Sequence, residues 1–191
     1  MRLITVAGPP SVGKTSVIAK TEKRLAADGW RVGAVKFDSL STTDDEVFRR
    51  AGLKVAVGLA GSVCPDHFFV SNIEDCLNWA GRAGLDMLIA ESAGLCNRCS
   101  PHIRGVTAVC VVDNLSGVHT PQKIGPMLKL ADIVIITKAD IVSQAEREVF
   151  RARILDAAPQ VRVREVNALY GIGVDPIADA IALAPEIEGE L

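Results

Sequence analysis

The sequence predicts a single α/β domain in which a mainly parallel central sheet is flanked by helices. Short apolar runs alternate with amphipathic stretches along the chain, which is typical of strands that alternate with helices. The run 133–137 is almost entirely β-branched, as expected of a strand covered on both faces. The chain has 191 residues, 49% of them hydrophobic, so we expect one domain with a substantial core.

Local signals predict the individual elements. Strands are expected at 3–7, 31–36, 86–91, 106–113, 133–137 and 161–166, of which the last alternates Arg with Val and suits an edge position. Helices are expected at 14–28, 43–51, 71–81, 121–131, 143–157 and 174–183. Thr43 is an expected N-cap, as is Ser71 or Asn72, and Gly125-Pro126 is expected to interrupt its helix.

The ligand site is expected beside two irregular stretches. These run over 38–69, apart from the helix expected at 43–51, and over 92–105. Both follow the carboxyl ends of expected strands, the edge where open α/β sheets bind ligands. We expect the domain to span 1–184, before an acidic, frayed tail at 185–191.

Charge and hydropathy exclude several classes of protein. The net charge is -2 and the isoelectric point is about 5.9, so no nucleic-acid partner is expected. No apolar run reaches the roughly 18 to 20 residues that span a bilayer, and the N-terminus lacks a signal-peptide pattern, so we expect a cytoplasmic protein without a membrane partner. Five cysteines, an odd number, argue against a disulfide framework.

A phosphate-binding motif follows the first expected strand and opens the first expected helix. The pattern is G-x-x-x-x-G-K-[ST], and its glycines permit a tight loop whose backbone N–H groups point at phosphate oxygens. Lys14 is expected to reach the β- and γ-phosphates, and the Thr15 hydroxyl to bind Mg²⁺. The expected nucleotide contacts here are Gly8, Pro9, Pro10, Ser11, Val12, Gly13, Lys14, Thr15 and Ser16. The motif predicts a P-loop nucleotide hydrolase.

Two carboxylates end strands near this loop. Glu91 closes an apolar run, and Asp38 ends the second expected strand. Either can hold Mg²⁺ or orient the attacking water, and the sequence does not choose between them. Lys14, Asp38 and Glu91 are therefore the expected catalytic residues, with Thr15, Asp38 and Glu91 around magnesium. No arginine finger is evident, so we expect slow intrinsic turnover.

A [N/T]-K-x-D tetrad follows the strand at 133–137 and favours GTP as the nucleotide. Its members are Thr137, Lys138 and Asp140, with Thr where Asn is usual. The aspartate of such a tetrad accepts hydrogen bonds from N1–H and the exocyclic amine of guanine, a donor pair that adenine lacks. Asn167-Ala168-Leu169 follows the next strand and is a further candidate for contact with the base.

With these motifs the chain resembles the metallocentre-assembly GTPases, which include the hydrogenase nickel-incorporation GTPase and the urease accessory GTPase. The resemblance covers nearly the whole length and rests on 8–15, Asp38, 91–94, 137–140 and Cys64-Pro65-Asp66-His67. It implies a nucleotide-dependent homodimer that delivers nickel, or a related metal, to a client metalloenzyme or its accessory proteins. Asp66 is an insertion relative to the family motif, and a histidine-rich nickel store is missing.

Two pairs of soft ligands fall in the irregular stretches. Cys64 and His67 have C-x-x-H spacing, and Cys96 and Cys99 have C-x-x-C spacing. Three thiolates and one imidazole would suit Zn²⁺, a square-planar set of nitrogen and sulfur would suit Ni²⁺, and cysteines paired across a two-fold axis could hold an iron–sulfur cluster.

The remaining cysteines and histidines are weaker candidates. Cys76 and Cys110 lie in apolar surroundings and are expected in the core. His102, close to the C-x-x-C pair, is a borderline ligand candidate, and His119 is expected to be an ordinary loop residue.

Two other functions remain open from the sequence. One is a small-molecule kinase that uses the same phosphate loop, although an arginine-rich lid is not evident. The other is an iron–sulfur or redox carrier that uses Cys96 and Cys99 and has an incidental nucleotide site.

Overall fold

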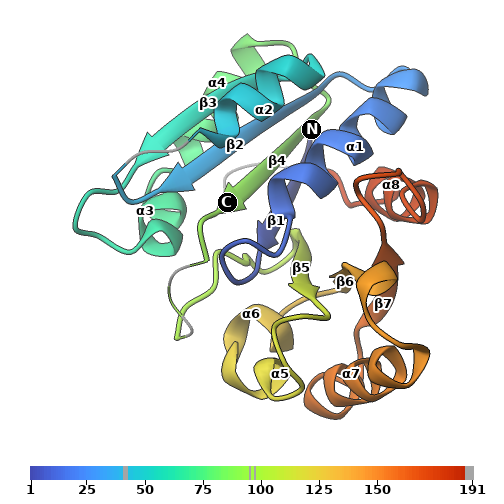
Figure 1. Ribbon diagram of the computed structural model, residues 1–191. Helices are drawn as coiled ribbons and strands as arrows, with labels where there is room; N and C mark the ends of the chain where they lie inside the picture. Colours follow the sequence, from blue (N-terminus) through green and yellow to red (C-terminus); the bar gives the residue numbers. More distant parts are fainter. Residues whose placement is uncertain (41–42, 95, 97, 188–191) are drawn as a thin grey trace.

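The computed structural model describes residues 1–40, 43–94, 96 and 98–187, and these form one seven-stranded sheet with helices on both faces (Figure 1). Every pair of neighbouring strands is parallel, and the strand order is β3-β2-β4-β1-β5-β6-β7. The strands are β1 (Arg2–Ala7), β2 (Val32–Asp38), β3 (Lys54–Leu59), β4 (Met87–Ser92), β5 (Thr107–Asp113), β6 (Ile133–Thr137) and β7 (Arg162–Val166). The expected α/β fold class is confirmed.

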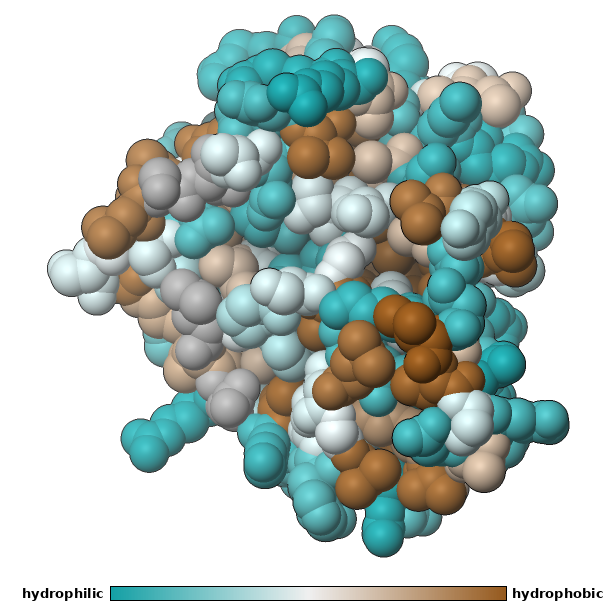
Figure 2. Space-filling view, in the orientation of Figure 1, coloured by the Kyte–Doolittle hydropathy of each residue, from teal (hydrophilic) through white to brown (hydrophobic). Residues whose placement is uncertain are grey.

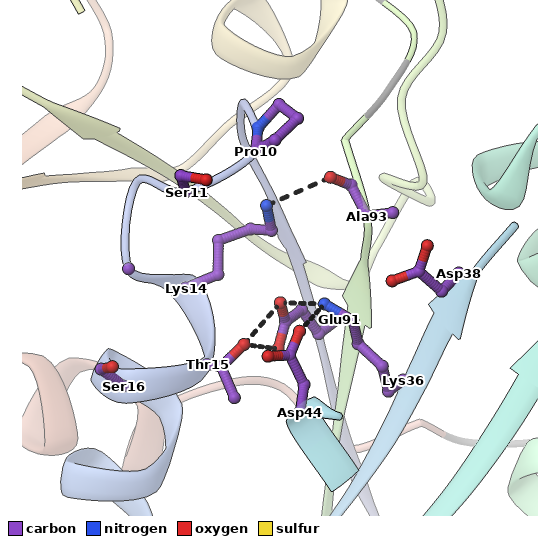
Figure 3. A pocket seen from close by; sticks show the side chains of 11 residues that line it. Pro10, Ser11, Lys14, Thr15, Ser16, Lys36, Asp38, Asp44, Glu91 and Ala93 are labelled. Carbon is purple, nitrogen blue, oxygen red and sulfur yellow. Dashed lines mark hydrogen bonds and ion pairs between the residues drawn. The ribbon is translucent and has the colours of Figure 1, made fainter. Parts of the chain in front are cut away.

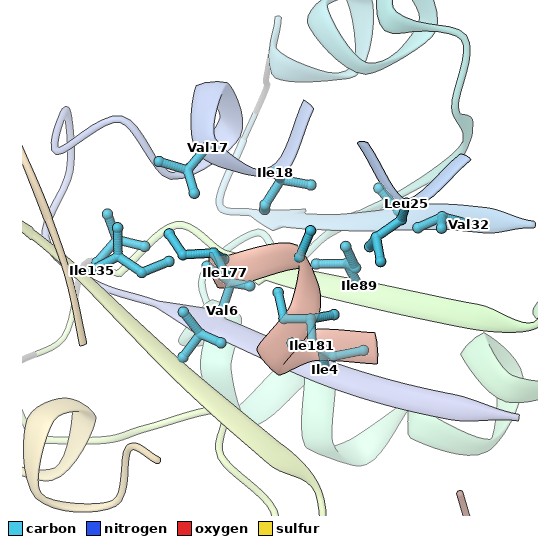
Figure 4. Packing of buried hydrophobic residues seen from close by; sticks show 14 of the residues in the cluster. Ile4, Val6, Val17, Ile18, Leu25, Val32, Ile89, Ile135, Ile177 and Ile181 are labelled. Atoms are coloured by element: carbon cyan, nitrogen blue, oxygen red, sulfur yellow. The ribbon is translucent and has the colours of Figure 1, made fainter. Parts of the chain in front are cut away.

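The helices divide between the two faces of the sheet. They are α1 (Lys14–Ala27), α2 (Asp44–Ala51), α3 (Pro65–Ser71), α4 (Ile73–Arg82), α5 (Thr120–Lys123), α6 (Pro126–Lys129), α7 (Gln144–Ala157) and α8 (Asp175–Ala182). Helices α1, α2 and α8 cover one face, where α1 and α8 pack on the central strands (Figure 4). On the other face, α3 and α4 cover β2 and β4, and α5 to α7 cover β5 to β7.

The sequence prediction missed β3. Residues 38–69 were expected to hold only one helix, but Lys54–Leu59 pairs with β2 along its whole length. This strand lies at the edge of the sheet and is mostly half-buried or exposed, so it lacks the continuous apolar run that marks a central strand. A Cβ on Gly58 would lie 2.4 Å from the Phe37 ring, so this strand position requires glycine.

The helix termini differ from the expectations in detail. The helix expected at 71–81 is α4, and the sequence prediction missed α3, which precedes it within the stretch expected to be irregular and meets it at Asn72. Thr43 and Asn72 occupy N-cap positions, but neither side chain makes a capping hydrogen bond, and the amide of Asn72 donates to the Phe68 carbonyl instead. The expected break near Gly125 is confirmed, because α5 and α6 are separate.

The two ends of the described chain lie together. The backbone N–H of Ile187 donates to the carbonyl of Met1, and Arg2 pairs with Glu186 at 3.1 Å. Within the tail expected at 185–191, residues 185–187 are therefore docked, and 188–191 lie outside the described residues. None of the described helices is both long and apolar enough to cross a bilayer.

Candidate functional site

The phosphate loop joins β1, the central strand, to α1. Gly8 and Gly13 have positive φ values of 144° and 93°, which L-residues rarely adopt. A Cβ on Gly8 would lie 2.0 Å from the Val111 carbonyl oxygen, so the loop can pass β5 only with glycine there. The resulting turn places the N-terminus of α1 at the carboxyl edge of the sheet, as the motif predicts.

Lys14 is buried at the mouth of this loop. Its ammonium donates to the carbonyl oxygens of Gly8 and Pro9, both at 2.9 Å, and of Ala93 at 3.3 Å. Burial lowers the pKa of Lys14 to about 8. The ammonium is thus held by neutral carbonyls, an arrangement that an incoming phosphate can replace with a stronger charge-assisted contact.

Polar side chains converge beside the loop in a cavity of about 340 Å³ (Figure 3). The Thr15 hydroxyl lies 3.0 Å from both carboxylate oxygens of Glu91. The Lys36 ammonium lies 2.5 Å from Glu91 and 2.7 Å from Asp44, the first residue of α2. Asp38 also lines the cavity, but its carboxylate accepts from the N–H of Ser39 and lies apart from this group. Hydroxyl and carboxylate oxygens are the donors that Mg²⁺ prefers, so the residues present fit that ion.

Sequence reasoning missed Lys36 and Asp44. Lys36 is 3% exposed although it carries a charge, because it sits inside the apolar strand β2 next to β4. Its burial opposes the charge, but Glu91 and Asp44 outweigh this effect and raise the pKa of Lys36. A lysine within an otherwise apolar, buried strand was the available signal, since such a group needs a carboxylate partner.

A second cavity, of about 480 Å³, lies on the other side of the phosphate loop. Asp140, Asn167, Ala168 and Leu169 line it, together with Thr137 and Lys138. The structure therefore brings the tetrad and the 167–169 segment together beside α1. The cavity is open and largely apolar at its walls, as a base-binding pocket requires.

Two members of the tetrad also brace the phosphate loop. The Thr137 hydroxyl donates to the carbonyl of Val12 at 2.6 Å, and the Lys138 ammonium donates to the carbonyl of Ser11 at 3.0 Å. Lys138 also pairs with Asp113 at the end of β5. The second cavity and the phosphate loop are thus parts of one connected region.

Three of the four expected soft ligands come together at the same edge of the sheet. The sulfur of Cys99 lies 3.5 Å from that of Cys64 and 2.7 Å from that of Cys96, and all three sulfurs are within 4.8 Å of one another. The hydrogen bond from Cys99 lowers the pKa of Cys96. Among the described residues, no other three potential metal ligands have their ligand atoms within 4.8 Å of one another.

His67 is not part of this cluster, contrary to the sequence expectation. Cys64 is the extended residue before α3, and His67 lies within the first turn of the helix with its side chain exposed. His102 is also elsewhere, between the Thr5 hydroxyl and the Met127 carbonyl, and burial lowers its pKa to about 4. Cys76 and Cys110 are buried in the core, as expected.

One buried contact links the start of α3, next to Cys64, to the strand that carries Glu91. Asp66, two residues after Cys64, accepts a hydrogen bond from the Ser92 hydroxyl at the end of β4. Ser92 follows Glu91 and precedes Ala93, whose carbonyl holds Lys14. Burial raises the pKa of Asp66, and its second carboxylate oxygen has no partner among the described residues. The first turn of α3 and Lys14 therefore contact consecutive residues, Ser92 and Ala93, at the carboxyl end of β4.

Comparison with known proteins gives the family. The family model described as CobW/HypB/UreG, nucleotide-binding domain, matches residues 2–165. An uncharacterized protein of Methanocaldococcus jannaschii is 47% identical over 98% of this chain and 80% of its own length. Urease accessory protein UreG 2 of Methylobacterium radiotolerans is 30% identical over 95% of this chain and 92% of its own length.

Solved structures agree with the fold. The hydrogenase maturation factor HypB of Archaeoglobus fulgidus has a TM-score of 0.75 at 22% identity, over 95% of this chain and 89% of its own. HypB of Helicobacter pylori, solved in complex with nickel, has a TM-score of 0.76 at 16% identity, over 95% of this chain and 86% of its own. With a family model that matches most of its length, this chain belongs to the CobW/HypB/UreG family of nucleotide-binding domains.

Proposed function

We propose that this protein is a Mg²⁺-dependent GTPase that binds a transition metal at Cys64, Cys96 and Cys99 and delivers it during assembly of a metalloenzyme. The observation that carries the proposal is the position of β4 between the two sites. Glu91 faces the phosphate-side cavity, and the next residue, Ser92, bonds to Asp66 in the first turn of α3, two residues after Cys64. A change of nucleotide state that moves the end of β4 would therefore be passed through Asp66 to the start of α3, next to Cys64.

On the nucleotide side, the roles follow from position and charge. The loop amides and Lys14 would bind the phosphates, and Asp140 would accept the hydrogen bonds that guanine donates. Thr15 and Glu91 would hold Mg²⁺, which neutralises charge on the phosphates during transfer to water. Glu91 or Asp38 would orient the attacking water.

On the metal side, the sulfur cluster has about the size that a metal ion needs. Metal–sulfur bonds of about 2.3 Å in a tetrahedral zinc site separate neighbouring sulfurs by about 3.8 Å. The Cys64–Cys99 separation is 3.5 Å, and the Cys96–Cys99 separation of 2.7 Å would widen by about 1 Å on binding. Zn²⁺ or Ni²⁺ with one further ligand from a partner or water would complete the site. The metal is cargo in this proposal.

Exposed apolar side chains support a protein partner at the same edge of the sheet. Leu40 follows β2, Leu59 ends β3, and Val63 precedes Cys64, and these three side chains are between 50% and 79% exposed. Figure 2 shows the corresponding apolar surface at its left edge, over the ends of β2 and β3. A second copy of the chain, a client enzyme or an accessory protein that covers this surface would lie beside the cysteine cluster.

The test is a titration of anaerobically reduced protein with Ni²⁺ and Zn²⁺, with and without a non-hydrolysable GTP analogue, following bound metal and molecular mass together. We expect metal to bind more tightly with the analogue, and Cys99→Ala to abolish binding. Cys76→Ala is the matched control, because Cys76 is a buried cysteine outside the cluster. Metal binding that ignores both the nucleotide and Cys99→Ala would refute the proposal.

An iron–sulfur carrier is the second candidate, because three cysteines at one edge of the sheet are also the protein ligands of a cluster with one open iron. Each thiolate would then bind a different iron, so the three sulfurs would have to separate further than for a single ion. Anaerobic reconstitution with iron and sulfide decides between the two. A coloured protein with stoichiometric sulfide, lost in Cys99→Ala, would favour the cluster, and a colourless protein would favour the single metal ion.

A further inference from the structure

The Lys36 ammonium occupies the position between the carboxylates of Glu91 and Asp44. We propose that Lys36 is a resident counter-cation that keeps Mg²⁺ out of this pair of carboxylates until a nucleotide binds. The proposal rests on the magnesium site of the proposed function. It adds a residue that neither the phosphate motif nor the carboxylates at the strand ends predict.

Lys36 is buried together with Glu91. Its side chain is 4% exposed, that of Glu91 is 1% exposed, and the two lie 2.5 Å apart. An ammonium in such surroundings is costly unless opposite charges surround it. Lys36 on β2 is paired directly with Glu91 on β4, so the strand pairing itself brings the two side chains together.

Lys36 also sets the charge balance of the cavity. Lys14, the other cation of the cavity, donates to three carbonyl groups and to neither carboxylate. Lys36 is in contact with both Glu91 and Asp44. With both lysines in place, the charges of Lys14, Lys36, Glu91 and Asp44 cancel, and without Lys36 the site carries one net negative charge. The attraction for a divalent cation in the nucleotide-free protein is correspondingly weak.

Nucleotide binding changes this balance. The phosphates of GTP add several negative charges at the adjacent loop, and Mg²⁺ is then attracted by phosphate oxygens as well as by Thr15 and Glu91. Lys36 thereby makes Mg²⁺ binding conditional on the nucleotide. Since Asp44 is the first residue of α2, the same ammonium also holds the start of this helix against the sheet.

The experiment measures thermal unfolding of nucleotide-free protein with Mg²⁺ alone, at constant ionic strength. We expect no shift for the wild type and for Lys36→Arg, which keeps the charge. For Lys36→Met and Lys36→Gln, which remove the charge, we expect the melting temperature to rise by about 4 °C at a tenfold excess of Mg²⁺ over its dissociation constant. Lys54→Met, on the neighbouring edge strand, is the control and should not respond.

The double variant Lys36→Met/Glu91→Gln removes both members of the buried pair, so it should fold even if the single variant does not, and it should show no Mg²⁺ response. A wild-type protein that responds to Mg²⁺ alone as strongly as Lys36→Gln would overturn the proposal. So would charge-removing variants without a response. Binding of a fluorescent GDP analogue is measured separately, so that failure of the proposed GTPase function is distinguished from failure of the role of Lys36.

Discussion

Gly94 provides the sharpest test of how the phosphate loop is packed. It has a φ of 71°, and a Cβ built on it would lie 1.7 Å from the carbonyl oxygen of Gly8 and 3.5 Å from the Lys14 ammonium nitrogen. A carbon and a carbonyl oxygen in contact are about 3.3 Å apart, so Gly94→Ala must push the two backbones apart by roughly 1.5 Å. Gly8 cannot yield toward β5, because its own close approach to Val111 already requires glycine.

The magnitude follows from two contributions. An alanine with positive φ costs about 1–2 kcal/mol, of which about 0.4–1 kcal/mol is offset because alanine restricts the unfolded chain. Overpacking adds about 1–3 kcal/mol. We therefore expect Gly94→Ala to lower the free energy of unfolding by about 2–4 kcal/mol. It should also weaken nucleotide binding, since the Gly8 carbonyl that would move is a partner of Lys14.

The matched control is Gly105→Ala. Gly105 has a φ of 81° and nothing within 4 Å of the added Cβ, so only the backbone contribution of about 1 kcal/mol applies. Urea unfolding gives both free energies, and titration with a fluorescent GDP analogue gives both affinities. If the two variants lose equal stability and Gly94→Ala binds the analogue as the wild type does, the close contact between Gly94 and Gly8 does not constrain the loop.

Three further predictions concern buried polar groups. Ser92→Ala leaves the Asp66 carboxylate without its donor and should lower the free energy of unfolding by about 1–3 kcal/mol; a loss no larger than in Ser92→Thr would contradict this. The folded pKa of His102, about 4, is below its ordinary value of 6.5, so the unfolded chain holds more protons in between. Stability should therefore fall as the pH drops from about 6.5 to 4, by roughly 2–3 kcal/mol, and His102→Gln should flatten this part of a urea-unfolding pH series. Thr137→Val removes the hydroxyl that donates to Val12 and should cost about 1 kcal/mol and weaken GDP binding, whereas unchanged affinity would show that this bond does not brace the loop.

Local sequence was sufficient to predict where the phosphate-loop motif and the tetrad lie in the fold. The phosphate loop is a run of contiguous residues between a strand and a helix, and the tetrad directly follows β6. Their chemistry depends on backbone conformation over a few residues, which glycines and spacing encode. The central strands were also predictable, because burial on both faces requires an apolar, β-branched composition.

The cysteine cluster shows where local spacing misleads. The C-x-x-H spacing of Cys64 and His67 suggested a shared site, but a helix begins between them, and its first turn leaves His67 exposed. Cys99 lies 35 positions from Cys64 along the chain and yet only 3.5 Å away in space. Cys64 follows β3 and Cys99 follows β4, and the carboxyl ends of these parallel strands lie at the same edge of the sheet.

The sequence by itself determined the phosphate loop, the tetrad and the strands that carry them, since these depend on short-range backbone preferences. Only the tertiary structure decided which distant side chains meet. Lys36 contacts Glu91 because β4 lies between β1 and β2, a strand order that no local pattern specifies. The same order places Ser92 against Asp66. The physical reason is that buried charges and hydroxyls must find partners, and the topology of the sheet determines which partners are within reach.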